Sequence, residues 1–454
     1  MTGSSAKRLK KKSRALKPFS IRNKVVPRAS FPLPGDKSIA HRALILSALS
    51  RGKAILKNFP FHDDSLATLK ALENLGVKIQ AGKNEVCVRG RGLRGLRPCR
   101  GEVFADNSGT TLRLLLGVLA GFDFKTRVTA GKYLSRRPMS RVNIPLRLMG
   151  ARIVSRLRGG EEYAPVTISG GNLKGIDYSL KIASAQVKSA ILLAGLFAAG
   201  RTRVRESLKT RDHTERMLKA FGAGICVKGK AVTLVPGREF SAPERIYIPG
   251  DISSASFFMV LAAAIPGSRV RLKGVGLNPG RSGIIGVLKR MGARIKISPA
   301  SSGSLKNFEP FGDILVCGGA LKGAVVESRE IPSLIDELPV LMVAACFARG
   351  RTLIKGAGEL RFKETDRINS MVFNLKRMGA DIRILKSGPL ENISIDGRGR
   401  LRGADLKSFG DHRTAMSMVV AGLASGEKFK LDDTGCINKS FPGFIEAVKR
   451  ACGI

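Results

Sequence analysis

The chain has 454 residues, of which 43% are hydrophobic, so it can bury a large core and form two or three domains. Its apolar runs, such as residues 190–199 and 340–348, are shorter than the roughly 18 to 20 residues that span a bilayer, which excludes a membrane segment. The formal net charge of +44 favours anionic partners: nucleic acid, an acidic membrane surface or small phosphorylated acids.

The cysteines and the N-terminal segment bear on compartment. Seven cysteines lie far apart without a C-x-x-C pair, which indicates a reducing compartment and neither a disulfide framework nor a zinc site. We therefore expect a cytoplasmic protein. The first 35 residues contain ten basic residues and no acidic one. They lack the apolar region of a secretory signal, so a disordered basic tail is favoured over an organelle transit peptide.

The first predicted helix lies within residues 33–52. It begins with Lys37, Ser38 and Arg42 and then continues almost wholly apolar to Gly52. A helix that is apolar on nearly every side is buried, which confines its polar residues to the first turn. Unpaired N–H groups and the helix dipole make that turn a candidate anion site. A capped core helix with a basic edge is the alternative.

The same design recurs along the chain. Five further apolar helices that end in Gly are predicted within residues 107–121, 184–200, 251–267, 336–350 and 411–426. They alternate with six amphipathic helices, each followed by a glycine C-cap and, in most cases, a strand-like segment; these glycines are Gly76, Gly150, Gly222, Gly292, Gly379 and Gly453. We predict an α/β protein of two domains, residues 33–248 and 249–454, each with three units and its apolar helices inside.

Polar residues collect at the starts of the predicted helices. Asn107 and Gly109 belong to an Asn-Ser-Gly-Thr run of the kind that cradles a carboxylate or phosphate. Asp336 is a candidate general base, since it is a carboxylate among cations. We interpret Asp251 as a helix cap alone, and His412 as a structural hydrogen-bonding residue.

A charged cluster at residues 361–367 places Lys363 and Arg367 four positions apart with Glu364 between them. Such a run is usually a solvated face. Because similar runs occur at equivalent helix starts, we expect them to converge at one cleft between the two domains.

Eight motifs, in order over residues 33–444, resemble one known family: PGDKSIAHR, DNSGTTLRLL, ASAQVKSAILLAGL, TRDHTERML, IDELPVL, RFKETDRI, GDHRTAMS and KSFPGF. The chain is similar to the 3-phosphoshikimate 1-carboxyvinyltransferases (EPSP synthases) of the enolpyruvyl transferase family. The resemblance implies two domains of three βαβαββ units, an inside-out α/β barrel arrangement, with residues 1–32 joining the second domain. It also implies transfer of the enolpyruvyl group of phosphoenolpyruvate to the 5-hydroxyl of shikimate 3-phosphate, in aromatic amino-acid synthesis, without a metal or organic cofactor.

The resemblance also implies roles for individual residues. Lys37, Asp336 and Glu364 would be catalytic, with Asp336 taking the hydroxyl proton and Glu364 protonating the methylene carbon. The residues implied to bind phosphoenolpyruvate are Lys37, Asn107, Gly109, Arg137, Gln186, Arg367, Arg413 and Lys439. Those implied to bind shikimate 3-phosphate are Lys37, Ser38, Arg42, Ser184, Gln186, Arg211, Asp336 and Lys363.

Four positions depart from the common pattern: Ala40, Ala185, Arg211 and Glu359. They place the chain nearer one bacterial branch. Gly109 is expected to leave room for glyphosate in the phosphoenolpyruvate pocket. We expect a monomer without membrane or specific nucleic-acid partners.

Three alternatives stay open. A UDP-N-acetylglucosamine enolpyruvyl transferase shares the fold but typically has a Cys in the loop at residues 131–141, which here has none. A nucleic-acid-binding protein fits the charge, but aromatic residues make up only 6% of the chain and it has no Trp, so stacking platforms are scarce. An inactive relative is the third.

Overall fold

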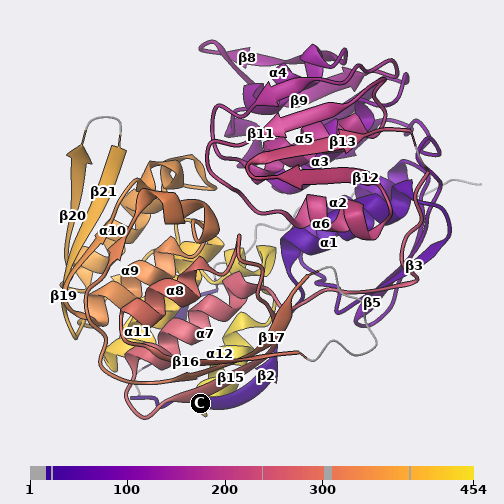
Figure 1. Ribbon diagram of the computed structural model, residues 1–454. Coiled ribbons are helices and arrows are strands. Elements are labelled where there is room, and N and C mark those ends of the chain that lie inside the picture. The colour runs from indigo at the N-terminus through magenta and orange to yellow at the C-terminus, as the bar shows by residue number, and fades with distance from the viewer. Residues whose placement is uncertain (1–16, 22–23, 238, 301–308, 388–389) are drawn as a thin grey trace, which may run out of the picture.

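The computed structural model describes residues 17–21, 24–237, 239–300, 309–387 and 390–454. Most of the basic tail therefore lies outside the described residues. The chain forms two lobes side by side (Figure 1), and each is built on its own hydrophobic core. Within the described residues, no helix is both long and apolar enough to cross a membrane.

The first lobe contains three buried helices, α1 (Lys37–Leu49), α3 (Gly109–Leu119) and α5 (Ala185–Gly195). Three further helices, α2 (Asp63–Asn74), α4 (Ser140–Leu148) and α6 (His213–Ala220), are amphipathic, and η1 (Leu134–Arg136) is a short 3-10 helix. Its strands are β3 (Lys53–Lys57), β4 (Lys78–Ala81), β5 (Glu85–Arg89), β6 (Glu102–Phe104), β7 (Thr126–Thr129), β8 (Arg152–Arg158), β9 (Glu161–Ser169), β10 (Asp177–Ser179), β11 (Thr202–Arg205), β12 (Gly224–Lys228), β13 (Ala231–Val235) and β14 (Arg245–Tyr247).

The second lobe repeats this plan with the buried helices α7 (Ile252–Ala264), α9 (Leu338–Phe347) and α11 (His412–Ser425). Its amphipathic helices are α8 (Gly283–Arg290), α10 (Arg367–Arg377) and α12 (Phe444–Cys452), and its 3-10 helices are η2 (Ser328–Ser333), η3 (Ala357–Phe362) and η4 (Gly435–Lys439). Its strands are β1 (Phe19–Ile21), β2 (Arg28–Pro32), β15 (Arg269–Gly276), β16 (Arg294–Pro299), β17 (Phe311–Cys317), β18 (Val325–Val326), β19 (Arg349–Ile354), β20 (Asp381–Ser387), β21 (Leu390–Arg398), β22 (Asp405–Leu406) and β23 (Phe429–Leu431).

Five of the six described sheets share one topology. Five have four strands, in which a parallel pair is followed by two antiparallel neighbours, as in β6-β7-β9-β8 and β18-β19-β21-β20. The sixth has three strands, β1-β23-β22. There the chain ends in α12, and β1 from the N-terminal segment supplies the antiparallel neighbour of β23. The predicted α/β fold of repeated units is confirmed, with this sixth unit shortened.

Two strands are exchanged between the lobes. Strand β2 precedes α1 in sequence but pairs with β15 of the second lobe. In Figure 1, β2 is drawn in indigo and lies beside β15. Strand β14 precedes α7 but pairs with β3 of the first lobe. The chain therefore crosses between lobes twice, and Gly35 forms an isolated bridge with Gly250 at the crossing. The Asn58 amide donates to the carbonyls of Leu33 and Ile248, at 3.3 and 3.0 Å, which ties both crossing segments together.

Side-chain caps begin most of the buried helices at the cleft between the lobes. Asp36, Ser108, Ser184, Asp251 and Asp411 each accept a hydrogen bond from a backbone N–H in the first turn. A cap of this kind satisfies donors that the helix leaves unpaired. Because the rest of each helix is mostly apolar and buried, most polar side chains lie near this end.

Candidate active site

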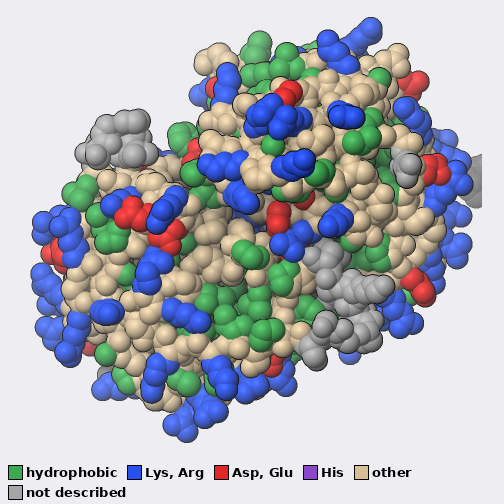
Figure 2. Space-filling model, in the orientation of Figure 1, with side chains coloured by type: hydrophobic (Ala, Val, Ile, Leu, Met, Phe, Trp, Pro, Cys, Tyr) green, Lys and Arg blue, Asp and Glu red, His purple; other side chains and the backbone are tan. Residues whose placement is uncertain are grey.

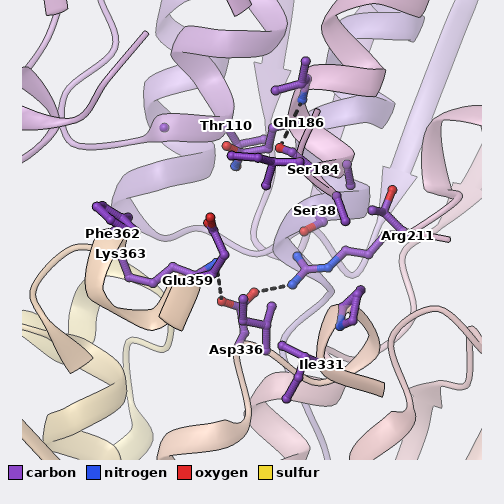
Figure 3. Close-up of a pocket in the computed structure, with 18 of the residues that line it drawn as sticks. Ser38, Thr110, Ser184, Gln186, Arg211, Ile331, Asp336, Glu359, Phe362 and Lys363 are labelled. Carbon is purple, nitrogen blue, oxygen red and sulfur yellow. Dashed lines mark hydrogen bonds and ion pairs between the residues drawn. The ribbon is translucent and has the colours of Figure 1, made fainter. Parts of the chain in front are cut away.

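A cavity of about 350 Å³ lies between the lobes. The starts of α1, α3 and α5 border it from the first lobe, and the starts of α9, α10 and α11 border it from the second (Figure 3). Figure 2 shows groups of Lys and Arg side chains on both lobes. The cavity brings together most of the predicted site residues: Lys37, Ser38, Gly109, Arg137, Ser184, Gln186, Arg211, Asp336, Lys363, Glu364, Arg367 and Arg413.

Asp336 is surrounded by cations. Its carboxylate accepts a hydrogen bond from Arg211 of the first lobe, and its Oδ1 lies 3.4 Å from Arg367 Nη1 and 3.8 Å from Lys363 Nζ. Arg413 donates to its backbone carbonyl at 2.9 Å. Burial alone would raise the pKa of Asp336, but Arg413, Arg211, Lys363 and Arg367 outweigh it and hold the pKa well below its usual range.

Glu364 is the second carboxylate of the cavity. It pairs with Arg367, and its Oε1 lies 3.5 Å from Lys439 Nζ. Burial opposes ionisation here too, but Arg367 and Lys439 keep the pKa of Glu364 well below its usual range. Both carboxylates are therefore held ionised, each matched by cations.

The first-lobe wall is ordered by polar contacts between side chains. Lys37 Nζ donates to Asp64 at 2.9 Å. Gln186 accepts from Arg113 Nη1 at 2.8 Å and donates to Thr110 at 3.0 Å. Burial and the neighbouring Arg137 and Arg141 lower the pKa of Arg113 to about 9. The wall thus presents a cationic surface whose side chains are already held in place.

Three predicted site residues do not line the cavity but contact residues or loops that do. Arg42 is buried and donates to Thr214, Ser189 and the Ser38 carbonyl at 2.6, 2.7 and 2.9 Å, which links α1, α5 and α6. Asn107 accepts from the N–H of Tyr133 at 2.9 Å and so holds the loop that carries Arg137. Lys439 reaches the cavity through Glu364.

Two sequence-based interpretations are wrong. Asp251 is more than a cap: it lines the cavity, and its carboxylate contacts Arg281 at 3.2 Å and the N–H of Lys37 at 3.4 Å. His412 is buried, but neither ring nitrogen has a hydrogen-bond partner within the described part of the chain. Burial, together with nearby cations that include Lys37, Arg413 and Arg367, lowers the pKa of His412 well below its usual value despite the opposing charge of Glu364.

The chain also matches the model of a known family. The family model for EPSP synthase (3-phosphoshikimate 1-carboxyvinyltransferase) matches residues 28–448. The chain belongs to the EPSP synthase family. The 3-phosphoshikimate 1-carboxyvinyltransferase of Desulforudis audaxviator is 48% identical over 418 residues, covering 92% of this chain and 95% of that relative. That of Bacillus subtilis is 43% identical over 420 residues, covering 92% and 96%.

Solved structures agree with this assignment. The EPSP synthase of Acinetobacter baumannii is 42% identical and superposes with a TM-score of 0.84, covering 96% of this chain and 98% of that one. The enolpyruvyl transferase NikO of Streptomyces tendae has a TM-score of 0.73 at 16% identity, covering 96% and 98%, and shares the fold. The predicted family, fold class and enzyme class are therefore confirmed.

Several lining residues were not among those assigned from the EPSP synthase motifs. Asp64, Arg113, Arg141 and Arg281 all line the cavity. Arg113 could have been found, since it lies four positions after Gly109 on one helix face. Arg281 carries no local signal, because a lone Arg in a Gly- and Pro-rich turn is typical of a solvated loop. Within the described residues, no three His, Cys, Asp or Glu side chains are grouped to hold a metal ion.

Proposed function

We propose that this enzyme transfers the enolpyruvyl group of phosphoenolpyruvate to the 5-hydroxyl of shikimate 3-phosphate and releases phosphate. The observation that carries this proposal is the position of Asp336 and Glu364, two largely shielded carboxylates in one cavity lined by cations from both lobes. Two phosphorylated carboxylic acids bring about six negative charges, and such charges leave water only where cations pair with them.

We assign the phosphoenolpyruvate side to the cations near Glu364 and to the start of α3. Arg137, Arg367 and Arg413 line this part of the cavity, and Lys439 supports it through Glu364. Gly109 lets the guanidinium groups of Arg113 and Arg137 come close to the helix start, because a Cβ there would lie 2.7 and 2.9 Å from their Nη1 atoms. Asn107 acts through the loop that it holds.

We assign the shikimate 3-phosphate side to Ser38, Ser184, Gln186, Arg211 and Lys363, which line the cavity. Hydroxyl, amide and cationic donors together suit a phosphate and a ring that carries hydroxyl groups. Arg42 supports this wall by fixing the Ser38 carbonyl. Lys37 lies at the border of the two sides and serves both.

The chemistry follows from the two carboxylates. Asp336 takes the proton of the 5-hydroxyl while the oxygen of that hydroxyl bonds to C2 of phosphoenolpyruvate. Glu364 protonates C3, which gives a tetrahedral intermediate. Phosphate then leaves, and Glu364 removes a proton from the methyl group to restore the double bond. Because substrate anions occupy the cations that face Asp336 and Glu364, we expect the pKa of each to rise on binding. Preorganised cations stabilise the intermediate.

We also propose that the enzyme works as a monomer in the cytoplasm. Residues of one chain line the cavity from both lobes, and all seven cysteines are free, which suits a reducing compartment.

The test is an assay of phosphate release from phosphoenolpyruvate with shikimate 3-phosphate or UDP-N-acetylglucosamine as acceptor. We expect turnover with the first acceptor alone, and losses of at least about a hundredfold in Asp336→Ala and Lys37→Met. Lys322→Met, which changes an exposed lysine, should keep full activity. Release with UDP-N-acetylglucosamine alone, or none with either acceptor, would overturn the proposal.

A further inference from the structure

Arg281 lies at the point where three helix starts from the two lobes meet. It belongs to the turn before α8, and 3% of its surface is exposed. Its Nη2 lies 3.5 Å from the cap of α1, Asp36, and 3.2 Å from the cap of α7, Asp251. Its Nη1 lies 3.4 Å from Glu337 at the start of α9, and 3.9 Å from Asp336.

One guanidinium therefore faces four carboxylates. Burial by itself lowers the pKa of Arg281, but Glu337, Asp36, Asp251 and Asp336 outweigh it and raise the pKa above its usual value. The contacts connect the first-lobe helix that carries Lys37 with the second-lobe segment that carries Asp336. They also lie beside the crossing between lobes, since the N–H of Asp36 donates to the Pro249 carbonyl at 2.7 Å.

Resting on the function proposed above, we propose that Arg281 is a positioning residue for the general base: it fixes Asp336 relative to Lys37 and to the crossing between the lobes. Its Nη1 and Nη2 face these carboxylates, and Nη2 also donates to Ser253 Oγ at 2.8 Å, whereas Nε has no hydrogen-bond partner within the described residues. Although Arg281 lines the cavity, both of its terminal nitrogens are engaged by protein groups, so we assign its effect to the position of Asp336. A displacement of about 1 Å in a reacting group can reduce turnover by about a hundredfold.

The charges around Asp336 determine how the loss of Arg281 changes the protonation of Asp336. Asp336 is faced by Arg211 from the first lobe, by Lys363 after η3, by Arg367 of α10, by Arg413 of α11 and by Arg281 before α8; Glu337 is its neighbour in the chain. Removing Arg281 takes away part of the positive charge that balances Glu337 and Asp251. It also makes Asp336 easier to protonate.

The experiment compares kcat, the KM values and the pH profile of phosphate release in Arg281→Gln and Arg281→Lys. We expect Arg281→Gln to lower kcat about tenfold or more, to change each KM by less than about twofold, and to shift the acidic limb of kcat upward by about one pH unit. Arg281→Lys should return the limb toward the wild-type pH, because it restores the charge. Lys289→Gln, an exposed charge removal on α8, should match wild type.

A second variant separates positioning from charge balance alone. If Arg281 only neutralises Glu337, then Arg281→Gln combined with Glu337→Gln should restore both the thermal midpoint and kcat, and that result would overturn the proposal. Recovery of the midpoint without recovery of kcat or of the pH profile supports it. A wild-type kcat and pH profile in Arg281→Gln, with Asp336→Ala inactive, would overturn this inference alone. An active Asp336→Ala would instead overturn the function assigned to Asp336.

Discussion

Arg211 of the first lobe donates a hydrogen bond to the carboxylate of Asp336 in the second. The proposed acceptor-binding cation is therefore joined to the proposed general base across the cleft. Both side chains are largely shielded, with 17% and 14% exposed, so the pair bonds in a low-dielectric environment. Shikimate 3-phosphate must share or replace this contact when it binds, which couples acceptor binding to the state of Asp336.

Replacing Arg211 should affect the acceptor more than the donor. In Arg211→Gln we expect the KM for shikimate 3-phosphate to rise at least about tenfold, since a hydrogen bond to a charged group is worth about 1.5–3 kcal/mol. The KM for phosphoenolpyruvate should change by less than about threefold. Steady-state phosphate release at varied concentrations of each substrate measures both. Arg201→Gln removes an exposed charge and is the control; equal increases in both KM values would contradict the assignment.

Gly109→Ala tests the phosphoenolpyruvate pocket. The added methyl group would lie within 3 Å of Arg113 and Arg137. The flexible ends of these side chains would have to move into the space that phosphoenolpyruvate occupies. We expect the KM for phosphoenolpyruvate to rise about tenfold, and competitive inhibition by glyphosate to weaken by at least as much.

Gly286→Ala is the matched control, because nothing lies within 4 Å of a Cβ at that position in α8. It should leave both constants unchanged. Absence of competition between millimolar glyphosate and phosphoenolpyruvate in the unmodified enzyme would disprove the pocket assignment.

Deprotonation of Lys363 should weaken the binding of shikimate 3-phosphate at alkaline pH. Burial, together with Arg367, Arg211 and Arg137, lowers the pKa of Lys363 to about 8 although Asp336 opposes this. Below pH 7 the ammonium is charged; as pH rises through 8 it loses its proton, so the KM for shikimate 3-phosphate should increase about tenfold per pH unit. Lys363→Arg keeps its charge and should flatten this limb. A limb that persists in Lys363→Arg would assign it to another group.

Replacing Lys188, which lies away from the cavity, should cause a large loss of stability. It is fully buried, with Nζ 3.0 Å from Glu206 and 2.5 Å from Glu215. Lys188→Met leaves two buried carboxylates without their cation and should reduce the free energy of unfolding by about 3–5 kcal/mol. Urea denaturation measures this free energy. Lys219→Met, which changes an exposed lysine, is the control and should reduce the free energy of unfolding by less than about 0.5 kcal/mol. Equal midpoints for the two variants would refute it.

The six apolar helices and their polar first turns could be predicted from the chain itself. Hydrophobic periodicity and glycine C-caps are local signals, and they located the helices that start at Lys37, Gly109 and Leu338 to within a few residues. The same reasoning indicated Asp336 as a base among cations, since an acidic residue at the start of a buried helix is visible in the sequence.

Distances between the lobes could not be predicted. Arg281 and Asp36 are far apart in sequence, and only the folded chain brings them within 3.5 Å. The exchange of β2 and β14 between lobes follows from sheet pairing, which depends on long-range contacts and not on local composition. The same holds for Arg42, whose donors are occupied by Ser189 and Thr214 behind the cavity.

The sequence by itself determined which residues stand at helix starts and what chemistry they bring, because the 3.6-residue period and the capping preferences act within a few positions. The tertiary structure decided which of those starts share one cavity and which cation faces which carboxylate, as Arg211 faces Asp336. That depends on how two separately packed cores meet. Electrostatic energies in a shielded cleft depend on separations of a few ångströms, and no local pattern encodes these.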